Sequence, residues 1–271
     1  MTTDPLLGQI LSCPVIDLAH SWAPDMPQWP GHPPFLLHLA RRHGDTWRDS
    51  GYSSANEIIV TSGHTGTHID GLGHSSCNGL LFGNRHAGDT QTGARGLREL
   101  GMEGVSPILR RGILLDIARQ RGQETLPHDC ALTAVDLALS ERQAGIHIGS
   151  GDVVLIRTGW GQHWRNPAGY VNLQTGWPGP DASGADWLAD RGIFATGADT
   201  ITYERFDPRI NRLPVHIRLI QKAGIHILEN LDLEGLSATG HVEFLFVCLP
   251  LTLVGATGSP IRPVAVLTKR Q

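Results

Sequence analysis

The sequence contains few cysteines and has no surplus of positive charge. Its four cysteines are widely spaced and form no CxxC pair (Cys13, Cys77, Cys130 and Cys248). This pattern argues against a disulfide framework and favours a reduced, cytoplasmic setting. Lys and Arg total 22 against 26 for Asp and Glu, which gives a net charge of -4. Because there is no basic surplus to bind a phosphate backbone, we expect no nucleic-acid partner.

Long apolar segments are also missing. Residues 1–9 lack the basic start and the apolar run of a signal peptide. The apolar run at residues 244–254 is interrupted by Pro250, and it is far shorter than the roughly 20 residues that a membrane-spanning helix needs. We therefore expect no association with a membrane.

Glycine and proline, by contrast, are abundant. The chain has 33 Gly and 17 Pro among 271 residues, which predicts many turns and loops. Hydrophobic residues make up 40% of the chain, enough for a large core. No shift in composition marks a linker, so we expect a single domain over residues 1–271.

Apolar runs and turn residues alternate through the chain. The pattern predicts strands at residues 15–18, 35–40, 56–61, 113–118, 152–157, 193–196, 225–228, 243–248 and 263–267. It predicts helices at residues 133–144, 181–191 and 214–223, each followed by a glycine. Five prolines between residues 23 and 34 predict an extended loop. The alternation of strands and helices indicates an α/β fold with some parallel pairing.

Residues 64–74, HTGTHIDGLGH, are the most informative segment. They contain three histidines and one aspartate, and imidazole and carboxylate groups are ligands of Zn²⁺, Mn²⁺ and Fe²⁺. In an extended segment, His68 and Asp70 share one face because side chains alternate with a period of two. A turn at Gly66 would bring His64 beside them. Three such ligands leave a coordination position open for water or substrate.

His74, four residues beyond Asp70, has two interpretations. It is either a fourth ligand or a general base or acid beside the activated water. We favour the acid–base role, because a free imidazole titrates near neutral pH.

The pattern HxGTHxDxxxH resembles the signature of the metal-dependent hydrolase family called cyclase. That family includes bacterial kynurenine formamidases, isatin hydrolases and a trans-dienelactone hydrolase. Further stretches resemble the family in the same order along the chain: residues 17–18, 26–31, 151–160, 216, 229–231 and 255–260. The resemblance implies an α/β domain around a mixed, partly barrel-like β-sheet with flanking helices, of the swivelling β/α type. It also implies a homodimer or a homotetramer.

The same resemblance implies residue roles. The family's first metal ligands match three residues of the motif, His64, His68 and Asp70. Its catalytic histidine matches His74. In the formamidase branch, the ligands of a second metal match His216 and Glu229, and the aspartate bridges both ions. The implied cofactor is a divalent metal, Zn or Mn, with one or two ions per subunit.

The substrate pocket is less well defined by the sequence. Trp29 matches a loop that lines this pocket in the family, and Trp22 and Phe35 are further candidates for an aromatic wall against a flat substrate. The chain has Leu72 where formamidases and isatin hydrolases commonly have a proline. Because we expect this loop to border the pocket, the substrate does not carry over from those relatives with the metal chemistry.

These observations together predict a metal-dependent hydrolase. We expect it to cleave an amide, lactam or aryl-formamide C–N bond of a small aromatic or cyclic substrate with metal-activated water. Three alternatives stay open: a lactone hydrolase of the dienelactone type, a metal-dependent lyase or cyclase, and a metal-binding protein without turnover. His74 distinguishes the last of these, because pure binding does not need a general base.

Overall fold

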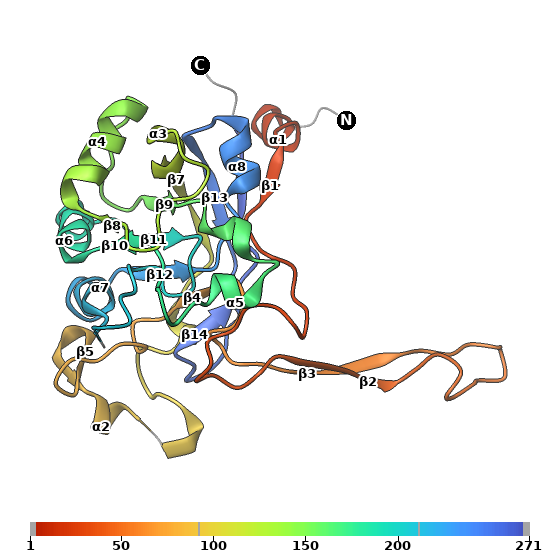
Figure 1. The fold of residues 1–271 in the computed structure, drawn as a ribbon. Coiled ribbons are helices and arrows are strands. Elements are labelled where there is room, and N and C mark those ends of the chain that lie inside the picture. Colours follow the sequence, from red (N-terminus) through yellow and green to blue (C-terminus); the bar gives the residue numbers. More distant parts are fainter. Residues whose placement is uncertain (1–3, 92, 211, 268–271) are drawn as a thin grey trace.

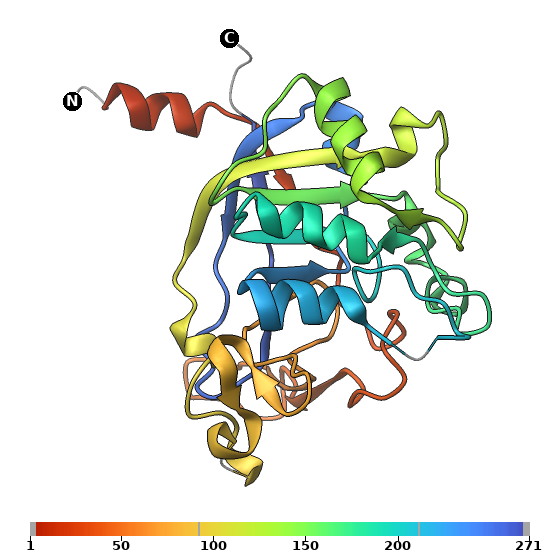
Figure 2. The same cartoon turned by 90° about the vertical axis from the view of Figure 1, so that its left-hand side faces the viewer.

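The computed structural model describes residues 4–91, 93–210 and 212–267. Over these residues the chain forms a nine-stranded sheet that curls into a half-barrel (Figures 1 and 2). In spatial order its strands are β1 (Val15–Asp17), β15 (Val264–Val266), β13 (Glu243–Cys248), β7 (Ile108–Asp116), β9 (Val153–Arg157), β11 (Ala195–Ala198), β12 (His226–Glu229), β4 (His68–Asp70) and β14 (Gly258–Pro260).

The centre of the sheet is parallel and its two sides are antiparallel. β7, β9, β11 and β12 run parallel, whereas β1, β15 and β13 on one side and β4 and β14 on the other pair antiparallel. The connections between the parallel strands contain α4 (Ala134–Ala144), α6 (Ala182–Asp190), and α7 (Pro214–His216) with its continuation η5 (Ile217–Ala223). These helices lie side by side on one face of the sheet (Figure 2).

Each face of the central strands is covered by its own apolar layer. In β9, Val154 and Ile156 pack into the cluster under the helices, and Val153 and Leu155 pack into the cluster on the opposite face. Because side chains alternate between faces, a strand covered on both sides is apolar in successive residues. This is why β9 is apolar from Val153 to Ile156, before its last residue, Arg157, which pairs with Asp116 and Glu234.

The remaining elements are short. The helices are α1 (Pro5–Leu11), α2 (Ala87–Thr90), α3 (Ile117–Gln120), α5 (Pro167–Tyr170), α8 (Glu234–Thr239), η1 (Phe82–Asn84), η2 (Gly93–Arg95), η3 (Met102–Gly104) and η4 (Trp160–His163). Two small sheets pair β5 (Leu80–Leu81) with β6 (Arg85–His86), and β8 (Ala131–Leu132) with β10 (Gly179–Pro180). In the described part of the chain, no helix combines the length and apolarity needed to cross a membrane.

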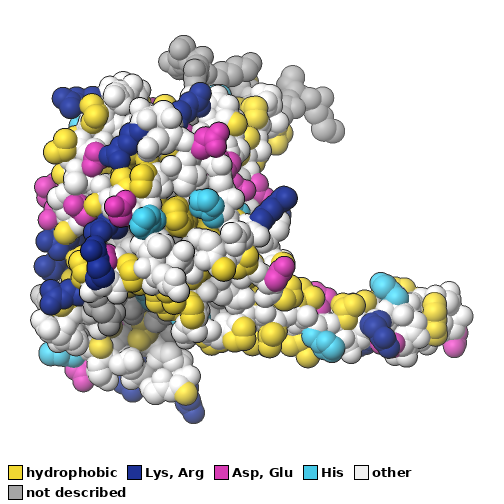
Figure 3. Space-filling model, viewed as in Figure 1, with side chains coloured by type: hydrophobic (Ala, Val, Ile, Leu, Met, Phe, Trp, Pro, Cys, Tyr) yellow, Lys and Arg dark blue, Asp and Glu magenta, His cyan; other side chains and the backbone are white. Residues whose placement is uncertain are grey.

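A hairpin projects from the body of the molecule (Figure 1). It consists of β2 (Leu36–Arg41) and β3 (Asn56–Val60), which pair antiparallel, and every residue of both strands is exposed. We call this hairpin the arm. Consecutive apolar residues in each strand place hydrophobic side chains on both of its faces, and they are visible along its length in Figure 3.

The predicted α/β class and mixed sheet are confirmed. The predicted helices and all nine predicted strands overlap elements of the structure, although β7 begins at Ile108 rather than Ile113. The sequence did not predict α1, α8 or β14. β14 consists of a glycine, a serine and a proline, and it forms a strand only because β4 pairs with it in the folded chain.

Thr133 is expected to stabilise α4 as its N-cap. Its hydroxyl accepts the N–H of Asp136, and the Asp136 carboxylate accepts the N–H of Thr133. The substitution Thr133→Ala removes the acceptor, so we expect the free energy of unfolding to fall by about 1 kcal/mol in urea denaturation. Thr133→Ser keeps the hydroxyl and should stay near the wild-type value. Equal losses in both variants would contradict the capping role.

Candidate metal centre

The histidine motif consists of a turn followed by the short strand β4, which lies between β12 and β14. In the register with β12, His68 lies opposite Glu229. His68 and Asp70 share a face of β4, and Nε2 of His68 lies 3.6 Å from Oδ1 of Asp70. The sheet therefore brings an acidic residue from much later in the sequence beside the motif.

Gly66 forms the turn that precedes β4. Its φ is +59°, and a Cβ at this position would overlap the indole ring of Trp22, so the turn requires glycine. The turn brings His64 back beside the strand. Nδ1 of His64 lies 2.7 Å from Oδ1 of Asp70, and Nε2 lies 2.9 Å from the hydroxyl of Thr257.

His216 reaches the same cluster from α7. Its Nε2 lies 3.2 Å from Oε1 of Glu229 and 3.7 Å from Oδ2 of Asp70. The other Glu229 oxygen, Oε2, lies 3.3 Å from Nε2 of His68. These four side chains are buried. The chain thus brings all five predicted metal ligands into one cluster.

The cluster has the composition and geometry of a divalent-metal site. Two groups can each hold a cation, one of His64, Asp70 and His74 and one of His68, Asp70 and Glu229, with ligand atoms within 4.8 Å of one another. Asp70 belongs to both groups, and its Oδ2 is buried with no hydrogen-bond partner among the described residues. An anionic oxygen in such a place is costly unless a cation binds it. Mixed imidazole and carboxylate donors suit Zn²⁺ and Mn²⁺.

The surrounding carboxylates favour the protonated form of two buried histidines in the cluster, His68 and His216. Burial would lower the pKa of His216, but its hydrogen bonds to Glu204 and Glu229 outweigh burial and raise the pKa well above the ordinary value. Glu229 likewise raises the pKa of His68 against the effect of burial. Burial and the negative charge of Asp70 would raise the pKa of Glu229, yet the two histidines lower it. A cation bound here must therefore displace protons from the histidines.

His74 lies at the side of the cluster. Its ring centroid is 4.0 Å from that of His64 and 6.1 Å from that of His216. Burial lowers the pKa of His74 to about 4, although the negative charge of Asp70 opposes the shift. The imidazole is therefore neutral at neutral pH and can accept a proton. His74 also belongs to one of the two ligand groups, so both interpretations from the sequence fit its position.

Two of the candidate ligand imidazoles are oriented by a hydrogen bond from the ring nitrogen that faces away from the cluster. Nδ1 of His68 donates to the Gly66 carbonyl at 2.8 Å, and Nδ1 of His216 donates to Glu204 at 2.6 Å. In both rings Nε2 is left to face the cluster. Asn230, which has a φ of +55°, donates to the same Gly66 carbonyl and ties the end of β12 to the turn.

The sequence analysis missed Glu204, Asn230 and the pocket residue His32 as site residues. Glu204 stands alone between Tyr203 and Arg205, with no motif around it. Its contact with His216 depends on the path of the chain between them. The position of Asn230, two residues after the predicted strand at 225–228 and directly after Glu229, is the one local signal for that residue.

A cavity of about 230 Å³ opens over the cluster. Trp29, Ile201 and Leu213 line it together with residues of the cluster. Trp29 makes edge contacts with the aromatic rings of Trp177 and Phe206. The cavity thus combines a polar, titratable region with apolar side chains, as in many small-molecule sites.

Other residues expected near the pocket lie elsewhere. Trp22 and Phe35 are not among the described residues that line this cavity. Their rings contact each other edge to face, with the ring centroids 5.2 Å apart, and Phe35 is buried. Leu72 packs against the apolar cluster under the helices. The presence of leucine instead of the proline of the formamidases and isatin hydrolases therefore affects the packing between the motif and the helices.

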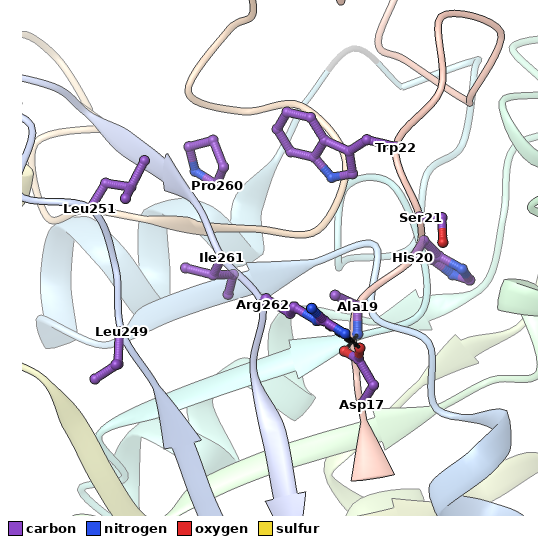
Figure 4. A pocket seen from close by; sticks show the side chains of 10 residues that line it. All are labelled: Asp17, Ala19, His20, Ser21, Trp22, Leu249, Leu251, Pro260, Ile261 and Arg262. Carbon is purple, nitrogen blue, oxygen red and sulfur yellow. Dashed lines mark hydrogen bonds and ion pairs between the residues drawn. The ribbon is translucent and has the colours of Figure 1, made fainter. Parts of the chain in front are cut away.

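A second cavity is larger and more open, with a volume of about 640 Å³, and Figure 4 shows the side chains that line it. Trp22, Leu249 and Ile261 line it, and the ion pair between Arg262 and Asp17 at 2.7 Å borders it. None of its described lining residues belongs to either ligand group. The smaller cavity is therefore the candidate active site.

Comparisons with known sequences point in the same direction. Residues 16–205 match the family model named Cyclase. Cyclase-like protein 3 of Oryza sativa subsp. japonica is 28% identical over 261 residues, which cover 93% of this chain and 79% of that protein. Kynurenine formamidase of Bacillus thuringiensis subsp. konkukian (strain 97-27) is 28% identical over 251 residues, which cover 92% of this chain and 95% of the enzyme.

Solved structures share the whole fold. The crystal structure of a novel cyclase superposes with a TM-score of 0.87 at 27% identity, and the match covers 96% of this chain and 89% of that one. Isatin hydrolase A from Ralstonia solanacearum superposes with a TM-score of 0.74 at 23% identity, with coverages of 98% and 99%. This second likeness concerns the fold.

The half-barrel sheet, the buried histidine–carboxylate cluster and these relatives define a metal-dependent hydrolase. Within that class, the chain belongs to the cyclase family. The resemblance noted for the motif in the sequence is thereby confirmed.

Binding of a divalent cation is expected to release protons. The pKa values of His68 and His216 are raised, which favours the protonated form of both rings, and each ring must lose the proton at Nε2 to bind metal. The affinity for Zn²⁺ should therefore fall as the pH is lowered. Titration calorimetry in buffers of different ionisation enthalpy measures the protons released. An affinity that is independent of pH between 6 and 8, with no proton release, would contradict this charge assignment.

Proposed function

We propose that this chain hydrolyses the C–N bond of an amide, lactam or aryl-formamide in a small aromatic or cyclic substrate. The observation that carries the proposal is Asp70, which belongs to both candidate ligand groups at one cavity and whose buried Oδ2 accepts no hydrogen bond from the described residues. The kynurenine formamidase among its relatives and the isatin hydrolase among its structural neighbours support an acyl C–N bond as the target.

The proposed cofactor is Zn²⁺ or Mn²⁺, with one ion or two per subunit. Three residues of the motif, His64, His68 and Asp70, would hold the first ion, and His216 and Glu229 would join Asp70 around a second. The shared position of Asp70 in both ligand groups supports a bridging role. When bound, the cation makes a nearby water more acidic and polarises the substrate carbonyl.

In the proposed mechanism, His74 moves the proton. The neutral imidazole accepts a proton from the water whose oxygen attacks the carbonyl carbon, and it then donates that proton to the leaving nitrogen as the C–N bond breaks. Because the pKa of His74 is about 4, its imidazole is neutral at neutral pH, and this supports its role as the first proton acceptor. The ring centroids of His74 and His64 are 4.0 Å apart. This position supports contact between His74 and a water held next to the ion that His64 would bind.

The proposed substrate wall is Trp29. Its ring lines the cavity beside Ile201 and Leu213, and an indole held by neighbouring aromatic rings offers a rigid face for a flat substrate. In the same proposal, Trp22 and Phe35 act by supporting the turn at Gly66, which Trp22 contacts closely.

We propose that the chain acts as a homodimer or homotetramer. The arm supports this proposal, because its apolar side chains are about half exposed (Leu36 52%, Leu37 51%, Leu39 47%, Ile58 55%, Ile59 55% and Val60 47%). A two-stranded hairpin is at best marginally stable alone in water, and an exposed apolar strand invites pairing. A second copy of the chain would cover it.

The remaining proposals concern the setting of the chain. Its four cysteines are unpaired, which supports a reducing, cytoplasmic location. The main sheet contains strands from Val15 to Val266, which supports one domain over residues 1–271.

Replacement of His74 tests the mechanism. We expect His74→Ala to lower kcat by about 10²–10⁴-fold, because the proton acceptor is lost, while the metal content per subunit stays at the wild-type level. Turnover and mass-spectrometric metal analysis of the same preparation measure both. If the variant loses its metal, His74 is a ligand; if it keeps near wild-type turnover, His74 is not the base.

A substrate panel tests the proposed reaction. N-formylkynurenine, isatin and a dienelactone each change ultraviolet absorbance on opening, and we expect turnover of at least one of the first two with wild-type protein loaded with Zn²⁺ or Mn²⁺. Solvent ¹⁸O should appear in the product carboxylate. Turnover of the dienelactone alone would move the assignment to a C–O bond, and a product without solvent oxygen would exclude hydrolysis.

A further inference from the structure

Glu204 is a buried acid beneath the metal cluster that the proposed mechanism does not use. It is 1% exposed. Oε1 accepts the Nδ1–H of His216 at 2.6 Å and the backbone N–H of His216 at 3.0 Å, and Oε2 accepts the backbone N–H of Val215 at 3.0 Å. Both oxygens are thus engaged by N–H groups, so the carboxylate faces α7 and is absent from both candidate ligand groups.

The local backbone explains how Glu204 comes to face inward. Tyr203, directly before it, has a φ of +57°, a left-handed conformation that few side chains adopt. Its ring is fully buried, and its hydroxyl lies 2.8 Å from the hydroxyl of Thr196 in β11. This anchor holds the turn against the sheet, so the next side chain is directed to the start of α7.

The contacts of Glu204 determine which nitrogen His216 presents to the cluster. Nδ1 carries the proton donated to Glu204, so Nε2 is the nitrogen near Glu229, at 3.2 Å, and near Oδ2 of Asp70, at 3.7 Å. We propose that Glu204 is a positioning residue that fixes the ring orientation and the tautomer of His216, so that Nε2 is directed to the second cation. This inference rests on the proposed two-cation centre.

The arrangement also predicts what persists when a cation binds. His216 lies between the carboxylates of Glu204, at Nδ1, and Glu229, at Nε2. A cation would bind at Nε2, on the side of Glu229, and would leave the hydrogen bond from Nδ1 to Glu204 intact. A carboxylate behind a ligand imidazole typically contributes about 10–100-fold in metal affinity. Glu204 should therefore act on metal binding through His216 alone.

The test compares Glu204→Gln with a matched control. Glu141 is also buried and also accepts a backbone N–H, from Ile148 at 2.8 Å, but its side-chain partners are Arg191 and His147. Glu141→Gln therefore makes the same chemical change away from the cluster. Zn²⁺ affinity is measured on chelator-treated protein by competition with a chromophoric chelator, and thermal unfolding of the cation-free variants reports folding. We expect about 10–100-fold weaker binding of the second Zn²⁺ for Glu204→Gln and wild-type binding for Glu141→Gln.

A double-mutant comparison separates positioning from a general structural effect. His216→Ala should itself weaken the second Zn²⁺ site, and Glu204→Gln added to it should cause no further loss, because Glu204 acts through the missing ring. Wild-type affinity in Glu204→Gln, or independent losses in the double variant, would overturn the proposal. A wild-type protein that binds no Zn²⁺ would overturn the proposed metal centre itself, which is a different result.

A measurement on the unmodified chain covers the case in which Glu204→Gln does not fold. Nitrogen-15 NMR of the histidine rings in the Zn²⁺-loaded protein distinguishes the two nitrogens of His216, which the spectrum of His216→Ala assigns. We expect Nδ1 to keep its proton and Nε2 to shift on Zn²⁺ addition. Loss of the Nδ1 proton, or coordination through Nδ1, would overturn the proposal.

Discussion

The site depends on the burial of one carboxylate. Asp70 is 1% exposed, and its Oδ2 has no hydrogen-bond partner among the described residues. Removing an ionised carboxylate from water costs several kcal/mol unless positive charge surrounds it. His64, His68 and His216 all approach Asp70 within 4 Å. His64 and His68 of the motif and His216 from outside it therefore all place positive charge near this carboxylate, and a divalent cation would do so most fully.

The mixed sheet explains how residues distant in the sequence come to surround the Asp70 carboxylate. Glu229 is the last residue of the parallel strand β12, and the antiparallel strand β4 begins opposite it with His68. Active sites of α/β proteins lie at the carboxyl ends of parallel strands, and here an antiparallel neighbour delivers the histidine motif to that end. The helical segment that leads into β12 carries His216. The helical crossover into β12 and the pairing of β12 with β4 thus bring together His216, Glu229 and the histidine motif.

Local chemistry allowed much of this to be predicted. The period of two placed His68 and Asp70 on one face, and Gly66 marked the turn that returns His64 to them. The glycines that follow the predicted helices marked the ends of the helices that cover the sheet. By contrast, β14 has no strand pattern, and the inward direction of Glu204 depends on Tyr203 in a left-handed conformation. Such features follow from contacts with distant segments, which residue patterns do not contain.

By itself, the sequence determined the α/β class, the metal-binding motif and the resemblance to the cyclase family, because periodicity, turn residues and ligand spacing are local properties. The tertiary structure decided which distant groups complete the site. Only the register between β4 and β12 places Glu229 beside His68, and only the path through α7 places His216 between Glu204 and Glu229. Those contacts join residues far apart in the chain, and they form because the sheet buries the strands that carry them.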